Sequence, residues 1–359
     1  MTRNNLSLSQ WQTYPMGPNL ANWLGFDDYS ISDNIQKDRD AREQINQSNE
    51  NLDCFDKDQG FSDFLLDRLN QPLEDIPPLS SEGLALILEE LIQMALPIPV
   101  MKFAEKYPFD DQDIDSITRF RFELAKGAAA MQLEELDIAE HSFKVAQKMV
   151  PEEVAPYINL LQIFLYEQRA EEAGIWLKAA LKASSNNMQL WDLAASLAQN
   201  IYSSNSEDEN SKVYSFIAAL AKEHDSWAGH ALLSELEQRA DKKAKVLSSY
   251  YAQGERSIEF LIEYTGALGA DSQYEKIPPI VWQFENSLLT NTTNNRGKHN
   301  IAWQLQMHCC QAFLALNQYE QFLQYCEKIT QNDSLPDMAK KHLEQLRVEV
   351  NQELGKNLH

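Results

Sequence analysis

The side chains best suited to covalent chemistry lie together at His308, Cys309 and Cys310. A histidine beside a cysteine could accept the thiol proton and leave a thiolate, which is the nucleophile in thiol-dependent catalysis. The alternative is a buried helical surface with a hydrogen-bonded imidazole, and this is the interpretation that we favour. The adjacent cysteines point to different faces of any helix, so they suit neither a metal site nor an easy disulfide.

Asp56, Asp58 and Gly60 have the residue types of a calcium-binding loop. The glycine comes one position early, however, and the twelfth residue is Asp67 where such a loop has glutamate. A second acidic stretch, DDQDIDS, has no glycine at all. For both stretches we therefore expect an acidic surface loop that leads into a helix.

Other chemical motifs are absent from the sequence. Its seven histidines show neither a His-x3-His spacing nor an HExxH motif, which argues against a zinc site. It has no GxSxG, no glycine-rich phosphate loop and no GxGxxG. Gly266 and Gly269, in YTGALGA, follow no strand and are expected at a close helix crossing. We predict no catalytic residue, no cofactor and no metal.

The charge of the chain restricts its partners. The 359 residues include 54 acidic and 31 basic side chains, which give a formal net charge of −23. Such a chain repels phosphate backbones and anionic membrane surfaces, so we expect no nucleic acid partner and no membrane insertion. A protein or peptide with a basic face fits this charge. The alternative is that acidity serves only to keep the chain in solution.

Several features bear on the cellular compartment. The first residues, MTRNNLSLSQWQTYPMG, contain no apolar run of signal-peptide length and no cleavage site. The most apolar segment, LALILEELIQMAL, is short and carries Glu89 and Glu90, so it cannot span a bilayer. The four cysteines have no CxxC spacing and fit reduced thiols. We expect a cytoplasmic location.

Composition divides the chain into three regions. Residues 1–60 are rich in Asn, Gln, Asp and Ser and are predicted to be irregular and partly disordered. Residues 61–116 are predicted to form a helical N-terminal region, in which Ser81 caps one helix and a shorter helix covers residues 101–106. Residues 117–359 are predicted to consist of helix pairs, since only 12 glycines interrupt the whole chain.

Two stretches share one arrangement of small, bulky and helix-ending residues. Small residues let two antiparallel helices approach closely, and a bulky side chain between them fills the gap. A proline cannot continue the helix and starts the next connection. Gly127, twelve residues before the first stretch, is expected where two helices cross closely. The two sets, offset by 34 residues, are Ala139, Phe143, Ala146 and Pro151, then Ala173, Leu177, Ala180 and Ser185.

This arrangement resembles the tetratricopeptide repeat family, whose 34-residue pattern is W-x2-L-G-x2-Y, then A-x3-F, then P. The resemblance is clearest over about residues 118–187, where Tyr157, Leu160 and Phe164 add the spacing that fills a hairpin core. The repeats are degenerate, and Leu161 stands in place of the second glycine. The resemblance implies an all-α fold: a right-handed α-solenoid of helix hairpins with an irregular N-terminal extension and a C-terminal capping helix. We expect five to six pairs.

The resemblance also implies a binding groove, because the first helix of each pair lines the concave side of such an array. Amide-rich positions there could hydrogen-bond to an extended peptide. The alternative is that they are ordinary exposed polar residues. The residues expected to point inward are Asn159, Gln162, Tyr166, Gln189, Asp192 and Ser196.

Members of the family that bind chaperone tails use Lys and Arg in this groove to clamp a terminal carboxylate. In this sequence the first unit offers Leu124 and Ala128 at such positions, and only Asn159 matches. We therefore expect no carboxylate clamp of that kind.

An aromatic island in the N-terminal extension, QWQTYPMGPNLANWLGF, contains Trp11, Tyr14, Trp23 and Phe26. It is expected either to pack back on the solenoid of its own chain or to dock on another protein. Clustered Trp and Tyr are efficient interface anchors, which makes Trp11 and Trp23 candidate partner-binding residues.

The leading hypothesis is a non-catalytic adaptor or scaffold that recognises another protein, or a chaperone dedicated to one partner. The first alternative is a peptide-sensing regulator whose solenoid tightens on its ligand. The second is an enzyme with its active site in residues 1–116. The sequence does not indicate an oligomeric state.

Overall fold

The structure is a computed structural model that describes residues 65–66, 69–70, 80–107, 115–202, 209–290, 296–330 and 335–356. Within these ranges the regular elements are helices and there is no strand, which confirms the all-α prediction. The chain divides into two compact units, Met1–Ser184 and Ser185–His359. The predicted boundaries after residues 60 and 116 stay predictions, and the N-terminal extension lies outside the described residues.

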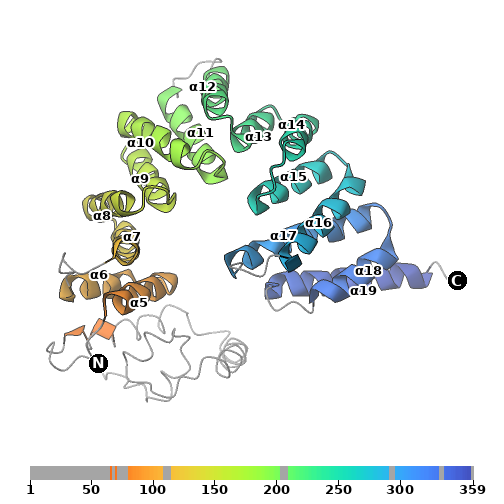
Figure 1. The fold of residues 1–359 in the computed structure, drawn as a ribbon, viewed down its shortest axis with the longest axis horizontal. Helices are drawn as coiled ribbons and strands as arrows, with labels where there is room; N and C mark the ends of the chain where they lie inside the picture. The colour runs from red at the N-terminus through yellow and green to blue at the C-terminus, as the bar shows by residue number, and fades with distance from the viewer. Residues whose placement is uncertain are drawn as a thin grey trace, which may run out of the picture. The chain divides into compact units, whose positions relative to one another are not determined.

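The first unit consists, in its described part, of successive helices packed side by side (Figure 1). Within each pair the first helix packs on the second, and the second packs on the first helix of the following pair. This order is that of an array of hairpins, as the repeat pattern predicts. The helices are α5 (Ser81–Gln93), α6 (Pro97–Lys106), α7 (Ser116–Gln132), α8 (Leu136–Met149), α9 (Ala155–Tyr166) and α10 (Ala170–Ala183).

Helices α5 and α6 begin at different residues from those predicted. The N-cap of α5 is Ser80 and not Ser81, because the Ser80 hydroxyl oxygen accepts a hydrogen bond from the Gly83 amide at 3.0 Å. Helix α6 begins at Pro97, four residues before the expected start. Proline suits the first turn of a helix, where its missing N–H would have no intrahelical partner.

The predicted close crossing in the first repeat is confirmed. A Cβ built on Gly127 of α7 would lie 2.7 Å from Cε1 of Phe143 on α8, closer than real Cβ contacts. Ala139, Phe143 and Ala146 of α8 are fully buried. A larger side chain at Gly127 would therefore have to push the two helices apart.

Tight turns close the hairpins of the first unit. Glu134 follows α7 with a φ of 60°, and Gln168 follows α9 with a φ of 58°, so both adopt the left-handed conformation. The next backbone N–H then reaches back into the last helical turn, and that of Arg169 donates to the Phe164 carbonyl at 2.8 Å. This turn places the Arg169 side chain at the start of α10.

The second unit continues the same pattern in its described part (Figure 1). The first helices of neighbouring pairs are also in contact: α11 contacts α13, and α15 contacts α17. The elements are α11 (Met188–Tyr202), α12 (Glu209–His224), α13 (Trp227–Leu236), α14 (Ala240–Ala252), α15 (Ile258–Ala270), the short 3-10 helix η2 (Tyr274–Lys276), α16 (Ile277–Thr290), α17 (Arg296–Ala315), α18 (Tyr319–Thr330) and α19 (Asp337–Lys356).

A close contact and two hydrogen bonds lock α11 against α13. A Cβ on Gly229 would lie 2.7 Å from the six-membered ring of the Trp191 indole. The Trp191 indole N–H donates to the Ser185 carbonyl at 2.7 Å, and the Ser226 hydroxyl donates to the same oxygen at 2.5 Å. The loop before α11 is thereby joined to the start of α13, which fixes the register of these two helices.

Candidate interaction surface

Three of the predicted binding residues lie on α9. Asn159 is half-buried, and its side-chain amide donates to the Ala155 carbonyl of the same helix at 3.0 Å. Gln162 is also half-buried, whereas the Tyr166 side chain is 74% exposed. Tyr166 is therefore the member of this set that offers the most surface to a partner.

Three more lie on α11, which belongs to the second unit. Gln189, Asp192 and Ser196 are all exposed. The Ser196 hydroxyl donates to the Asp192 carbonyl at 3.0 Å, so its proton is used within the helix. The Asp192 carboxylate has no ion-pair partner among the described residues. The set on α9 and the set on α11 are features of separate units.

Three successive first helices contribute carboxylates that lie near enough for their charges to act on Asp192. The three carboxylates are Asp192 on α11, Glu235 on α13 and Glu263 on α15. Neighbouring protein atoms partly desolvate the Asp192 carboxylate and raise its pKa, and the negative charges of Glu235 and Glu263 raise it further. Together with Lys243 on α14, these residues are called the acidic face.

Lys243 is the cation of the acidic face. Its side chain is only 14% exposed, and its ammonium pairs with Glu263 at 2.8 Å and with Glu235. Burial alone would lower the pKa of Lys243, but the hydrogen bonds to Glu235 and Glu263 outweigh it and raise the pKa. One ammonium thus pairs with two carboxylates, and Asp192 adds a third negative charge, which leaves the surface negative.

Of the acidic face, Asp192 was predicted from the sequence, whereas Glu235, Lys243 and Glu263 were not. One observation could have found the two glutamates: each lies, like Asp192, on the first helix of its pair. The degenerate repeats beyond residue 187 obscure the phase of these helices, so their inward positions could not be read from the 34-residue offset.

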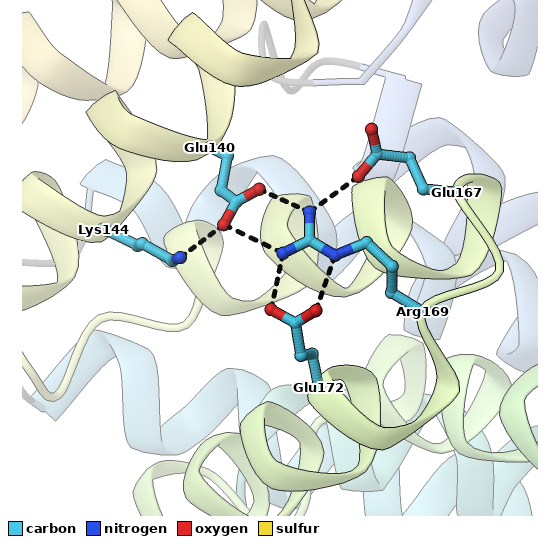
Figure 2. Close-up of polar contacts among 5 residues, drawn as sticks. All are labelled: Glu140, Lys144, Glu167, Arg169 and Glu172. Carbon is cyan, nitrogen blue, oxygen red and sulfur yellow. Dashed lines mark hydrogen bonds and ion pairs between the residues drawn. The ribbon is translucent and has the colours of Figure 1, made fainter.

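A second cluster of charges lies in the first unit (Figure 2). The Arg169 guanidinium donates to Glu140 at 2.6 Å, to Glu167 at 2.7 Å and to Glu172 at 2.7 Å. Glu140 on α8 also accepts a hydrogen bond from Lys144, one turn along the same helix. The hydrogen bonds from Arg169 and then from Lys144 outweigh burial and lower the pKa of Glu140. This Arg169 cluster joins α8 to the start of α10.

The hairpins, the glycine crossing in the first repeat and the small residues of α8 together decide the kind of fold. The helix pairs are tetratricopeptide-like repeats. No family model matches the chain, and no curated protein sequence matches it.

Solved structures with a similar course of the chain include yeast Tom70, with 14% identity and a TM-score of 0.47, covering 85% of this chain and 61% of that chain. A tetratricopeptide repeat protein from Parabacteroides merdae ATCC 43184 has 12% identity and a TM-score of 0.33, covering 74% and 98%. The apo form of RapI has 12% identity and a TM-score of 0.29, covering 94% and 98%. This chain thus spans less than two thirds of Tom70, and such scores assign it no activity and no partner.

In the repeats of the second unit, the candidate nucleophile site is a buried surface. Nδ1 of His308 lies 2.8 Å from the Thr265 hydroxyl, so the imidazole is hydrogen-bonded as the favoured interpretation predicts. Cys309 and Cys310 are fully buried. Burial, followed by the charge of Glu285, raises the pKa of Cys309 to about 12. Neither a thiolate nor an accessible sulfur is available there for catalysis.

Asp115, near the end of the second acidic stretch, is the N-cap of α7. Its carboxylate accepts hydrogen bonds from the amides of Ile117 and Thr118, at 3.0 Å and 2.9 Å, and caps α7. The Thr118 hydroxyl also donates to this carboxylate and contributes most to lowering the pKa of Asp115, and the two amide hydrogen bonds lower it further. The stretch therefore leads into a helix, as predicted.

Other predicted features lie outside the described residues: Trp11, Trp23 and the loop around Asp56. Among the residues that the structure does describe, no three His, Cys, Asp or Glu side chains are grouped in a way that could hold a metal ion. Within the same residues, no helix combines the length and the apolar character needed to cross a bilayer.

Proposed function

We propose that this chain is a non-catalytic scaffold or a partner-specific chaperone that binds another protein through the first helices of its repeats. The observation that carries the proposal is the acidic face, where Glu235 and Glu263 share the single ammonium of Lys243 and Asp192 adds a third carboxylate. An excess of negative charge on an exposed surface attracts a basic segment and speeds its encounter. The formal net charge of −23 acts in the same direction.

Exposed polar and aromatic residues support the same proposal. Gln189 and Ser196 lie beside the acidic face on α11 and could hydrogen-bond to an extended backbone. Tyr166 on α9 offers an aromatic ring of the kind that anchors interfaces. Asn159 and Gln162 are half-buried and would contribute only their outer atoms.

A panel of short fluorescent peptides tests this function. The peptides share one sequence except that their basic residues are exchanged for uncharged or acidic ones. We expect the full chain to bind the basic peptides, with an affinity that falls as salt is raised, because salt screens exposed charges. Equal binding of the acidic and basic members, or binding of none, would overturn the proposal.

The variant Asp192→Asn assigns the binding to the acidic face. It removes one charge without breaking an ion pair, so we expect the fold to keep its stability and the basic peptides to bind about threefold more weakly. Glu327→Gln is the matched control, since Glu327 is an exposed residue of α18, a second helix. If Glu327→Gln weakened binding as much as Asp192→Asn, the peptide would be sensing only the overall charge.

A further inference from the structure

The second unit contains a pocket of about 500 Å³ that shares Lys243 and Glu263 with the acidic face. Side chains from α14, α15, α17 and α19 line it. Its volume lies in the range of sites that enclose a small ligand or a long side chain. The residues that line it include Lys243, Glu263, Gly266, Trp303, Met307 and His308.

The hollow depends on a glycine. At Gly266 the nearest atom to a Cβ would be Cε1 of His308, at 3.6 Å, so a methyl group there would make only an ordinary van der Waals contact. Gly269 is similar, because a Cβ there would be 3.8 Å from Tyr274. The crossing of α15 with its neighbours therefore does not require glycine at either position, because a Cβ there would make only ordinary van der Waals contacts. At Gly266 the missing side chain leaves space in the pocket.

The pocket wall combines apolar and aromatic surface with a carboxylate. Trp303 and Met307 come from α17, and Met307 is 9% exposed. His308 adds no positive charge near neutral pH, because burial lowers the pKa of its ring, although Glu263 opposes this. An aromatic ring beside a carboxylate is a combination that binds a cation.

The charges around the pocket select the sign of the occupant. Lys243 already pairs with Glu235 and Glu263, so an incoming anion would have to compete with both carboxylates. An incoming cation would be repelled by Lys243, but the three negative charges of Glu263, Glu235 and Asp192 outweigh that single positive charge. The pocket is therefore complementary to positive charge.

We propose that this pocket receives an arginine side chain from an extended segment of a partner protein, with the guanidinium against the Trp303 ring and the Glu263 carboxylate. Arginine fits better than lysine, because its planar guanidinium stacks on aromatic faces, pairs with carboxylates through two bonds and is weakly hydrated. The inference rests on the proposed function only in taking the partner to be a protein.

N-acetyl-arginine amide tests the pocket without a partner. Its binding is followed through the indole N–H resonance of Trp303, which the variant Trp303→Phe identifies among the 7 tryptophans. We expect a saturable shift of this resonance. N-acetyl-citrulline amide has the same shape without the charge and should bind at least tenfold more weakly, since it loses the charge-assisted bond. The lysine amide should bind more weakly than the arginine amide, and the glutamate amide should not bind.

Two variants test whether the shift comes from the pocket. Gly266→Leu fills the hollow and should abolish the shift, and Glu263→Gln should weaken arginine binding about tenfold while keeping the size of the side chain. Gly269→Ala changes a glycine of the same helix that does not line the pocket and should bind like the unchanged chain. If Gly266→Leu failed to fold, Glu263→Gln would still decide.

The outcomes separate this inference from the proposed function. No saturable shift with the arginine amide, an equal response to citrulline, or binding of the glutamate amide would overturn the arginine pocket. If basic peptides bound the chain and Asp192→Asn weakened them but Gly266→Leu did not, the scaffold would stand and the pocket proposal would fail. If the arginine amide bound but no peptide did, the proposed function would fail, and with it the assignment of the arginine to a partner protein, whereas the guanidinium-binding pocket itself would stand.

Discussion

The two units both hold charged clusters between neighbouring repeats, but they pair their charges to different extents. In the Arg169 cluster the guanidinium donates from all three of its nitrogens, and Lys144 adds a second cation (Figure 2). In the acidic face the single ammonium of Lys243 serves two carboxylates. A third carboxylate there has no ion-pair partner among the described residues.

The difference follows from the shape of the two cations. The guanidinium of Arg169 is a planar fork, and its Cζ also lies 4.6 Å from the centre of the Phe164 ring. It can therefore join several carboxylates and an aromatic ring in one fixed arrangement. The ammonium of Lys243 is a point charge at the end of a flexible stem. We conclude that the first cluster holds neighbouring repeats together, whereas the second leaves negative charge uncompensated on the surface.

The largest difference between the two units is expected from replacing one glycine of each by alanine and comparing the free energies of unfolding. Gly127→Ala should lower the free energy of unfolding by about 1–3 kcal/mol, because the new methyl group would overlap the Phe143 ring. Gly266→Ala should raise it by about 1 kcal/mol, because alanine favours the helix and its Cβ would make only an ordinary contact with His308. Denaturant unfolding measures both. Effects of the same sign would contradict this account of the two positions.

Removing the cation of the acidic face should change stability and binding in opposite directions. Lys243→Met keeps the aliphatic stem but leaves Glu235 and Glu263 without their shared partner. We expect a loss of about 2 kcal/mol in the free energy of unfolding, less than for a fully buried pair because the carboxylates are partly exposed. Basic peptides should bind more tightly to this variant in a fluorescence titration. Weaker binding would show that Lys243 itself contacts the partner.

The matched change in the first unit should affect stability alone. Arg169→Met should lower the free energy of unfolding by about 1 kcal/mol, because several partly exposed charge-assisted bonds are lost. Peptide affinity should stay the same, since the Arg169 cluster is a structural contact. The same titration that follows Lys243→Met checks this. A change in peptide affinity would remove the distinction between the two clusters.

The smallest effect concerns pH. Burial lowers the pKa of His308, so the folded chain binds a proton there more weakly than the unfolded chain. Above the pKa of an unfolded histidine, the contribution of His308 to stability therefore does not depend on pH. As the pH falls below that value toward the lower pKa of the folded chain, the free energy of unfolding decreases. Between neutral and mildly acidic pH, the melting temperature of His308→Gln should therefore fall less than that of the unchanged chain. His141→Gln, at an exposed position of α8, is the control for the substitution. Equal pH dependence of His308→Gln and the unchanged chain would contradict the prediction.

The sequence predicted individual residues of the candidate interaction surface but not which charged residues lie together on it. Asp192 was found because its helix lies next to the clearest repeats. Glu235 and Glu263 carry no local mark that separates them from other exposed acids of a strongly acidic chain. Only the packing of α13, α14 and α15 shows that both pair with Lys243. Trp11 and Trp23 stay predictions.

The sequence by itself determined that this chain folds into tetratricopeptide-like helix pairs and that Gly127 lies at a close crossing. Such features depend on neighbouring helices, and the spacing of small and bulky residues along a short stretch encodes those contacts. Only the tertiary structure decided that Gly266, Lys243 and Trp303 line one pocket. They come from three helices, and the direction of each side chain depends on the rotation of its helix, which degenerate repeats do not specify.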